Sequence, residues 1–318
     1  METRKPFYQL IDGVPRCANV DPALVRKALN FKASKGDLVQ WSYPKSGTHW
    51  VQYLIQLILK EREVVDSYEE FAKNCRPMEY VDIEGWKSSL PFRCFATHLP
   101  PRPETMNNEA RYVYVARNPW DTCVSLFHMV TNLSIYKFED GTFDEFFEAF
   151  LNLDFGYGSY FDHVASGYAF RDAPNVFFVT YEELKTDTRA TVIKLANFLG
   201  RSYGVRLEDS ENGLLDQIIE RSSSGHMKHV IVMNLAGGET NDWDSMMTRN
   251  NMRCKNGYGG DCTKYGIVRN GKVGDWKNYF KPEQLRRLEC EIQAKGAKAS
   301  FMSLWDDIRE ETIEVSHL

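Results

Sequence analysis

Eight residues from Tyr43 to Trp50, reading YPKSGTHW, have the composition of a phosphate-binding turn. Ser46 and Gly47 permit a tight turn whose backbone N–H groups point at an anion, and the helix that follows adds its positive dipole end. Lys45 supplies a point charge that can follow negative charge on a bridging oxygen. A Walker A loop is excluded, because the pattern GxxxxGK[ST] is absent. An ordinary strand–turn–helix junction with a surface lysine is the alternative interpretation.

Arg117 and Ser125 form a second candidate anion site. Pro119 stands where a helix is expected to begin, so Arg117 lies at the end of the preceding strand. Ser125 comes eight positions after Arg117, which is near two helical turns, or about 800° of rotation, so it faces broadly back toward the strand end. The two side chains could then hold one phosphate. An arginine that only caps the sheet edge is the alternative.

Two further stretches carry groups suited to chemistry. His98 follows an apolar run, and it is either a general base or a hydrogen-bonded structural residue. Residues 269–277, reading RNGKVGDWK, suit a loop folded over a phosphate, although a solvated turn has a similar composition. His226 and His229 have helical spacing, but no third ligand is nearby, so we expect no metal site.

Four apolar, β-rich runs must position these residues, and helical periodicity follows most of them. The runs span residues 38–43, 92–97, 112–116 and 176–180. Strands that alternate with helices predict an α/β fold with a mainly parallel central sheet flanked by helices. Ligands bind beyond the carboxyl ends of such strands. That edge should therefore gather an anion site and a candidate base, formed by Lys45, His98, Arg117 and Tyr181.

The absence of an obvious acidic metal ligand argues against the nearest competing enzyme class. Metal-dependent phosphoryl transferases of the P-loop type need a carboxylate for Mg²⁺ at the end of a neighbouring strand. Here that strand ends in Arg117, and the remaining candidates, Glu182 and Glu183, stand at an expected helix start. A P-loop kinase or NTPase is therefore kept as an alternative function, ranked below the one that the motifs favour together. A nucleotide-binding protein without activity is ranked below both.

The composition is that of one globular domain covering residues 1–318. A net charge of −5 does not favour nucleic acid or an anionic membrane as a partner, so any bound anion must be held by a local cluster. The apolar run 51–59 is too short to cross a bilayer, and no apolar leader segment is evident. Seven cysteines without a CxxC pair favour free thiols and the cytoplasm, although Cys254 and Cys262 could in principle pair.

The segment from about residue 241 to residue 274 is rich in Asn, Gly and charge, with little periodicity. We predict a long surface loop that acts as a lid or binding loop, because loops of this length in compact domains are usually functional. A disordered insertion is the alternative.

The motifs together resemble those of the cytosolic sulfotransferases over about residues 30 to 300. They are YPKSGT-W, THLP, RNP followed by serine, and RxGxxGDWKN, in this order. The resemblance implies direct transfer of a sulfuryl group from 3′-phosphoadenosine 5′-phosphosulfate (PAPS), without a metal, to a small hydroxyl-bearing acceptor. The chain length, and the absence of an expected transmembrane anchor in this sequence, disfavour the Golgi carbohydrate enzymes of the wider family.

The same resemblance implies a role for each matched residue. The loop that holds the 5′-phosphosulfate would be Lys45, Ser46, Gly47 and Thr48. The adenine contacts would be Trp50 and Tyr181, with Ser222 in the position of the family's threonine beside the base. The clamp on the 3′-phosphate would be Arg117, Ser125, Arg269, Asn270 and Gly271. The catalytic base would be His98, with Lys45 neutralising the departing oxygen.

The chain also departs from the family pattern. His49 replaces a second threonine of the nucleotide-binding loop, Ala96 replaces a lysine near the reaction centre, and Asn270 replaces a common lysine. The family's dimer segment would begin at Lys277, but its expected Thr, Val and Glu are here Lys281, Pro282 and Arg286. We therefore expect a monomer or a different dimer.

The acceptor pocket is less clearly encoded than the nucleotide site. Its candidate lining residues are Met78, Tyr80, Phe95, Phe127, His128 and Tyr136, and for each of them an ordinary core position is the alternative. An aromatic-lined pocket favours phenols, catechol-type monoamines or flat alcohols over sugars. A phenol has a pKa near ~10, so a neutral imidazole at His98 would have to take its proton during attack on sulfur.

Overall fold

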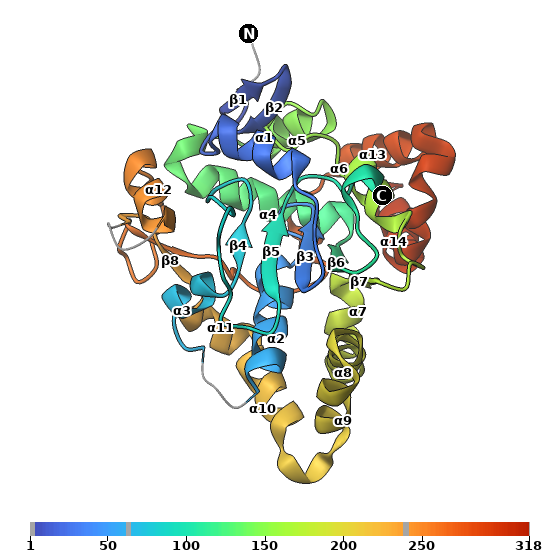
Figure 1. The fold of residues 1–318 in the computed structure, drawn as a ribbon. Helices are drawn as coiled ribbons and strands as arrows, with labels where there is room; N and C mark the ends of the chain where they lie inside the picture. Colours follow the sequence, from blue (N-terminus) through green and yellow to red (C-terminus); the bar gives the residue numbers. More distant parts are fainter. Residues whose placement is uncertain (1–3, 62–64, 238–241, 318) are drawn as a thin grey trace.

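The centre of the molecule is a five-stranded sheet in which every neighbouring pair of strands is parallel (Figure 1). The computed structural model describes residues 4–61, 65–237 and 242–317. In spatial order the strands are β4 (Arg76–Pro77), β5 (Arg93–Thr97), β3 (Asp37–Ser42), β6 (Arg111–Ala116) and β7 (Val176–Thr180). The prediction of a parallel sheet flanked by helices is confirmed, with β4 as an addition at the edge.

The strands are apolar because both faces of the sheet are covered. All six residues of β3 are buried, and they alternate between two cores: Leu38 packs in one, and Val39 and Trp41 pack in the other. Gln40 is a buried polar residue in the middle of the strand, and its Nε2 donates to the backbone carbonyl of Thr48 at 3.0 Å. This bond ties the middle of β3 to the first turn of the following helix.

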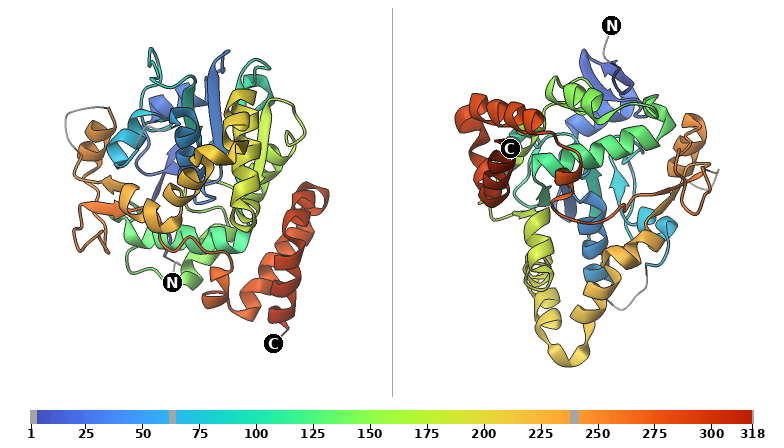
Figure 2. Two further views of the ribbon diagram at one scale, coloured as in Figure 1. Left: turned by 90° about the horizontal axis from the view of Figure 1, so that it is seen from below. Right: turned by 180° about the vertical axis from the view of Figure 1, so that it is seen from behind.

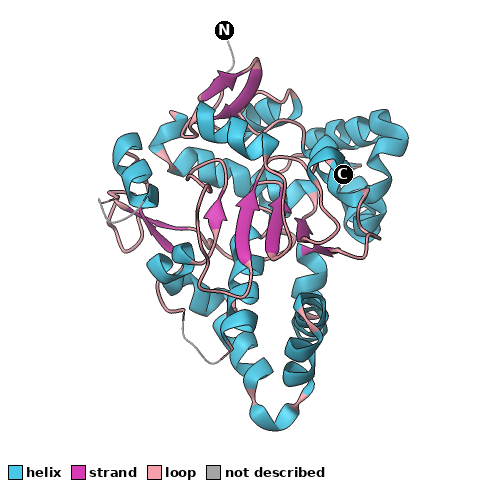
Figure 3. Cartoon of the chain, in the orientation of Figure 1, coloured by secondary structure: helices cyan, strands magenta, loops and turns pink. Residues whose placement is uncertain are grey.

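Helices cover both faces of the sheet (Figure 3). One core contains residues of α2 (Thr48–Lys60), α8 (Thr188–Leu199) and α10 (Leu214–Arg221). The other contains residues of α1 (Pro22–Asn30), α4 (Pro119–Asn132), α5 (Phe143–Leu151) and α6 (Tyr160–Tyr168). Among the described helices, none is both long enough and apolar enough to cross a bilayer.

The remaining elements surround this three-layered body. Helices α8 and α9 (Arg201–Glu208) run away from the sheet, and α10 runs back toward it, so the three helices form a projecting limb (Figure 2). The helix α13 (Pro282–Lys295) packs against α14 (Asp306–Ser316) at one side of the body. The other elements outside the sheet and its two covering layers are β1 (Tyr8–Ile11), β2 (Val14–Cys17), α3 (Tyr68–Lys73), α7 (Tyr181–Thr186), α11 (Ser224–Val230), β8 (Val232–Asn234), α12 (Asp242–Asn250) and β9 (Lys264–Gly266).

The segment expected to be a long loop has secondary structure in its described part, residues 242–274. It contains α12 and β9, and β9 pairs antiparallel with β8. Two backbone hydrogen bonds, from Ser134 to the carbonyl of Arg253 and from Lys255 to the carbonyl of Asn132, anchor it to the end of α4. The described part is therefore not one continuous loop. Residue 241 lies outside the described residues.

Candidate active site

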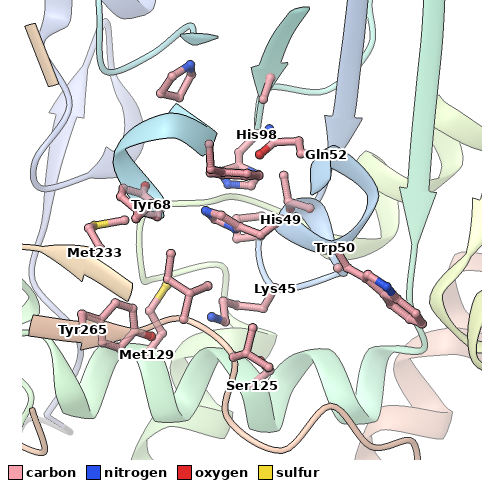
Figure 4. A pocket seen from close by; sticks show the side chains of 18 of the residues that line it. Lys45, His49, Trp50, Gln52, Tyr68, His98, Ser125, Met129, Met233 and Tyr265 are labelled. Carbon is pink, nitrogen blue, oxygen red and sulfur yellow. The ribbon is translucent and has the colours of Figure 1, made fainter. Parts of the chain in front are cut away.

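A cavity of about 270 Å³ opens at the carboxyl edge of the sheet. The four residues that follow the strand ends, Lys45, His98, Arg117 and Tyr181, all line it. The wall also contains the following predicted nucleotide-site residues: Gly47, Thr48, His49, Trp50, Ser125, Ser222, Arg269, Asn270 and Gly271. Figure 4 shows His98, His49, Lys45 and Ser125 in succession along this cavity.

The loop between β3 and α2 has an unusual backbone that brings it close to α7. Lys45 has φ +68° and Gly47 has φ +106°, both in the left-handed region. A Cβ atom at Gly47 would lie 2.9 Å from Cδ2 of Tyr181, so a larger residue would meet the ring as well as backbone strain. Ser46 is fully buried and does not line the cavity, whereas Thr48 Oγ1 lies 2.7 Å from Ser42 Oγ.

Three cations converge on this loop. Burial, together with Arg117 and Arg269, lowers the pKa of Lys45 to about 8. Lys45 is therefore protonated at neutral pH but is held in an environment that disfavours its charge. A ligand with more than one anionic group would relieve the repulsion between these cations. The cluster therefore suits a ligand that carries several phosphate or sulfate groups.

Arg117 is held in place by contacts on several sides. Its Nη2 donates to the carbonyl of Lys272 at 2.9 Å, and its guanidinium lies 4.5 Å from the centre of the Tyr181 ring. Asp121, one helical turn later, lies 3.6 Å from the same Nη2. The arginine is consequently fixed between α4, α7 and the loop that contains Lys272.

Asp121 is a residue that reasoning from the sequence missed. Its carboxylate is buried and accepts the backbone N–H groups of Gly274 at 2.8 Å and of Trp276 at 3.1 Å. These bonds attach the loop of residues 269–274 to α4. An acidic residue in the first turn of a helix is an ordinary helix-start feature, so no sequence pattern indicates that Asp121 also holds a distant loop.

The loop of residues 269–274 packs closely on its neighbours. Gly271 has φ +63°, and a Cβ there would lie 2.8 Å from Cβ of Ser224. Arg269 forms an ion pair with Asp275. The predicted clamp residues therefore share one wall with Arg117 and Ser125, although they are separated from them by about half of the chain.

An aromatic pair forms the neighbouring part of the wall. The rings of Trp50 and Tyr181 meet edge to face, with centroids 5.3 Å apart, and Nζ of Lys185 lies 4.9 Å from the centre of the Trp50 ring. Ser222, which is buried and caps α10, completes this part of the cavity. Such a surface suits a flat heteroaromatic ring.

The hydrogen bonds of His98 define its protonation pattern. Its Nδ1 lies 2.9 Å from the carbonyl oxygen of Ser42, at the end of β3. Because a carbonyl oxygen only accepts hydrogen bonds, Nδ1 carries the proton, and Nε2 of the neutral ring is left as a proton acceptor. The backbone N–H of His98 donates to the carboxylate of Glu79 at 2.6 Å, which fixes the residue further.

Glu182 and Glu183, considered from the sequence as metal ligands, have structural roles. Glu182 accepts hydrogen bonds from the backbone and side chain of Asn118 and from the indole of Trp305. Glu183 forms a capping box with Thr180 at the start of α7. Neither glutamate lines the cavity; among its described residues the one carboxylate is that of Glu79.

The acceptor-pocket expectations divide into two groups. Tyr80 and Tyr136 line the cavity. Met78 lines a separate small cavity, and Phe95 is buried between the rings of Phe31 and Trp86.

Phe127 and His128 are also away from the cavity, and helix geometry explains why. Ser125 and Met129, four positions apart on α4, both line it. Successive side chains of an α-helix are about 100° apart around its axis. Phe127 therefore points about 200° away from Ser125, and His128 points about 100° away from Met129. Both pack against Tyr279, and Nε2 of His128 lies 2.7 Å from its hydroxyl. The expectation that these four residues line the pocket is therefore corrected.

Methionines form much of the wall that reasoning from the sequence did not identify. They come from α4, α11, β8 and α12 and from the chain that follows α12: Met129, Met227, Met233, Met247 and Met252. The aromatic side chains Tyr68, Phe71, Tyr157 and Tyr265 accompany them. Most of these residues stand in segments far from the recognised motifs, so only the folded chain brings them together.

A cluster of hydroxyl groups interrupts this apolar wall. The Tyr136 hydroxyl lies 2.9 Å from that of Tyr157 and 3.3 Å from Sγ of Cys17. The Tyr157 ring meets the His98 ring edge to face at 6.2 Å. Hydrogen-bonding groups are therefore present close to the candidate base.

Comparison with known proteins places the chain in a family. Residues 35–300 match the family model of the sulfotransferase domain. Sulfotransferase 1E1 of Mus musculus is 31% identical over 299 residues, covering 90% of this chain and 92% of its own length. Sulfotransferase 1C2 of Oryctolagus cuniculus is 28% identical over 290 residues, covering 88% of this chain and 89% of its own length.

A solved structure agrees with the sequence comparisons. The crystal structure of mouse sulfotransferase SULT7A1 complexed with PAP superposes with a TM-score of 0.64 at 25% identity. The likeness covers 98% of this chain and 99% of the other. The match of the family model across most of the chain, with a 31% identical relative over nine tenths of it, confirms the resemblance seen in the motifs: this protein belongs to the sulfotransferase family.

Proposed function

We propose that this sulfotransferase moves a sulfuryl group from PAPS to the hydroxyl of a small phenolic acceptor, phenolic monoamines included. One observation carries the proposal: a single cavity has the cations Lys45, Arg117 and Arg269 on its wall together with His98, next to a largely apolar wall. A doubly anionic donor and an apolar nucleophile could therefore meet inside it.

The residues of the wall would divide the donor between them. Lys45 and the backbone of residues 45–48 at the start of α2 would hold the 5′-phosphosulfate. Arg117, Ser125 and the loop of residues 269–271 would hold the 3′-phosphate, since arginine and backbone N–H groups suit phosphate oxygens. Trp50, Tyr181 and Ser222 would contact the adenine. The PAP bound to the similar mouse protein supports this assignment.

The transfer itself would need one proton acceptor and one cation. Nε2 of His98 takes the hydroxyl proton while the acceptor oxygen forms its bond to sulfur. The bond from sulfur to the bridging oxygen breaks, and Lys45, protonated at neutral pH, neutralises the charge left on the 5′-phosphate. General base assistance of this kind contributes roughly 10²–10⁴-fold to a rate.

The composition of the wall supports a phenol as the acceptor. Methionine side chains are flexible and make favourable contacts with aromatic rings, and the tyrosines add flat apolar area. Sugars would leave many hydroxyl groups without partners on such a wall. The buried carboxylate of Glu79 is the feature that could favour a monoamine within the phenol class.

A turnover assay tests the proposed function. Purified protein is incubated with PAPS and either p-nitrophenol or dopamine in the presence of EDTA, and sulfated product is measured by mass spectrometry. Product that depends on PAPS is the expected result. Protein that binds PAP but sulfates no phenol would contradict the acceptor assignment. In a parallel reaction with ATP and Mg²⁺ and without EDTA, phosphorylated product would indicate a kinase.

The cellular setting and assembly remain part of the same proposal. All seven cysteines are free thiols, which supports a reducing compartment such as the cytoplasm. We also keep the prediction that the chain is a monomer or a dimer of another kind than the family's usual one, and that residues 242–274 act as a lid.

A further inference from the structure

His49 has a position that the proposed roles do not use. It lies in the first turn of α2 and lines the cavity. Figure 4 shows the His49 ring between the His98 ring and the side chain of Lys45. The reacting sulfuryl group of the proposed reaction must lie between the same two residues, because Lys45 serves the leaving oxygen and His98 serves the attacking one.

The ring of His49 is held in place while its nitrogens are available. It stacks on Phe71 of α3, with centroids 5.6 Å apart and planes 25° from parallel. Within the described residues its ring nitrogens make no hydrogen bond. The residue is half-buried and lines the cavity, so a ligand bound there can supply a hydrogen-bond partner to its imidazole.

The charge state of His49 defines what it can offer. Burial, with additional repulsion from Lys45 and His98, lowers the pKa of His49 to about 3. The ring is therefore neutral at physiological pH, with one N–H donor and one acceptor nitrogen. A group with such a low pKa is a poor base for a phenol, which leaves donation as its useful chemistry.

We propose that His49 is a second catalytic imidazole, which donates its ring N–H to a non-bridging oxygen of the sulfuryl group in flight. This proposal rests on the proposed function. Negative charge on the sulfuryl oxygens must be stabilised while the bond to the bridging oxygen breaks, and a preorganised hydrogen-bond donor does so effectively. On the same wall, residue 96 is an alanine, which carries no donor.

Two substitutions distinguish the effect of the N–H donor from the effect of the stacked aromatic ring. His49→Phe keeps an aromatic ring that can stack on Phe71 but removes the N–H group, whereas His49→Gln keeps a neutral N–H donor. We expect kcat of His49→Phe to fall by about 10²–10³-fold, the usual effect of removing one such donor. His49→Gln should retain most of the turnover, and the Kd for PAP should stay nearly constant in both variants.

The pH dependence provides a readout that a structural role would not change in this way. Because His98 is the base, the acid limb of the kcat profile should stay at the same pH in His49→Gln. A shift of this limb would assign the base to His49 and would overturn the donor role. Should His49→Phe fail to fold, as judged by circular dichroism and PAP binding, His49→Leu serves as the variant without a donor.

The remaining outcomes are each decisive. An unchanged kcat in His49→Phe, equal losses in the Phe and Gln variants, or a Kd for PAP that rises as far as kcat falls would each overturn the proposal. The wild-type protein is assayed alongside: if it sulfates no phenol, the proposed function fails and the role of His49 fails with it. If the wild type is active, any failure concerns His49 alone.

Discussion

Asp121 offers a sharp test of how the cavity wall is assembled. Its buried carboxylate is the acceptor for the N–H groups of Gly274 and Trp276, and these bonds hold the loop of residues 269–274 against α4. In Asp121→Asn, one carboxylate oxygen becomes an NH₂ group that faces an N–H donor. One of the two bonds is then lost, and the other loses its charge assistance.

The size of the effect follows from these bonds. Hydrogen bonds to charged groups contribute about 1.5–3 kcal/mol each, so we expect the docking of the loop to weaken by about 2–3 kcal/mol. Arg269, Asn270 and Gly271 are on that loop, and bound PAP would have to restore its position. The Kd for PAP should therefore rise by about 30- to 150-fold, because each 1.4 kcal/mol is a factor of about ten.

Titration calorimetry with PAP measures this change, and thermal unfolding followed by circular dichroism is recorded in parallel. Asp172→Asn is the matched control, since the Asp172 side chain is 84% exposed and the residue does not line the cavity. The control should bind PAP as the wild type does. If Asp121→Asn also had wild-type affinity and the wild-type melting temperature, the carboxylate would not be holding the loop.

Three further substitutions or conditions test the assigned roles. His98→Ala should abolish product formation while PAP binding stays nearly intact in calorimetry; near-normal turnover would contradict the base assignment. Arg117→Ala should weaken binding of PAPS far more than binding of adenosine 5′-phosphosulfate, which lacks the 3′-phosphate, and equal losses for the two would count against the clamp. The affinity for PAP should fall by up to about tenfold between about pH 7 and about pH 9, because free Lys45 has a pKa of about 8 and the bound phosphate favours its protonated form. Calorimetry at both pH values checks this, Lys45→Met is the control that cannot titrate there, and a constant wild-type affinity would refute the assignment.

The sheet could be predicted from the sequence because parallel strands that are covered on both faces appear as short apolar runs. The residues just after those runs were expected to meet, and Lys45, His98, Arg117 and Tyr181 do line one cavity. The strand β4 has two residues, which is too short for any periodicity to reveal. The helix α12 was missed because Asn, Gly and charged residues dominate its surroundings and hide its buried methionines, Met246 and Met247.

The acceptor wall could be predicted only in part, because it depends on which way each side chain faces. Phe127 and Met129 are two positions apart on the same helix, yet only Met129 lines the cavity. No motif distinguishes them without knowledge of where α4 is placed. The wall is also assembled from segments separated by long stretches of chain, such as Tyr68, Tyr157 and Met247, which tertiary packing alone brings together.

The hydrogen bond from Nδ1 of His98 to the carbonyl of Ser42 has a consequence for the end of each catalytic cycle. In the proposed reaction, a proton captured at Nε2 could not be passed through the ring to the protein interior, because Nδ1 faces a carbonyl oxygen that already accepts its hydrogen and carries no exchangeable proton of its own. The proton must instead depart through the mouth of the same chamber that the spent nucleotide and the sulfated product vacate.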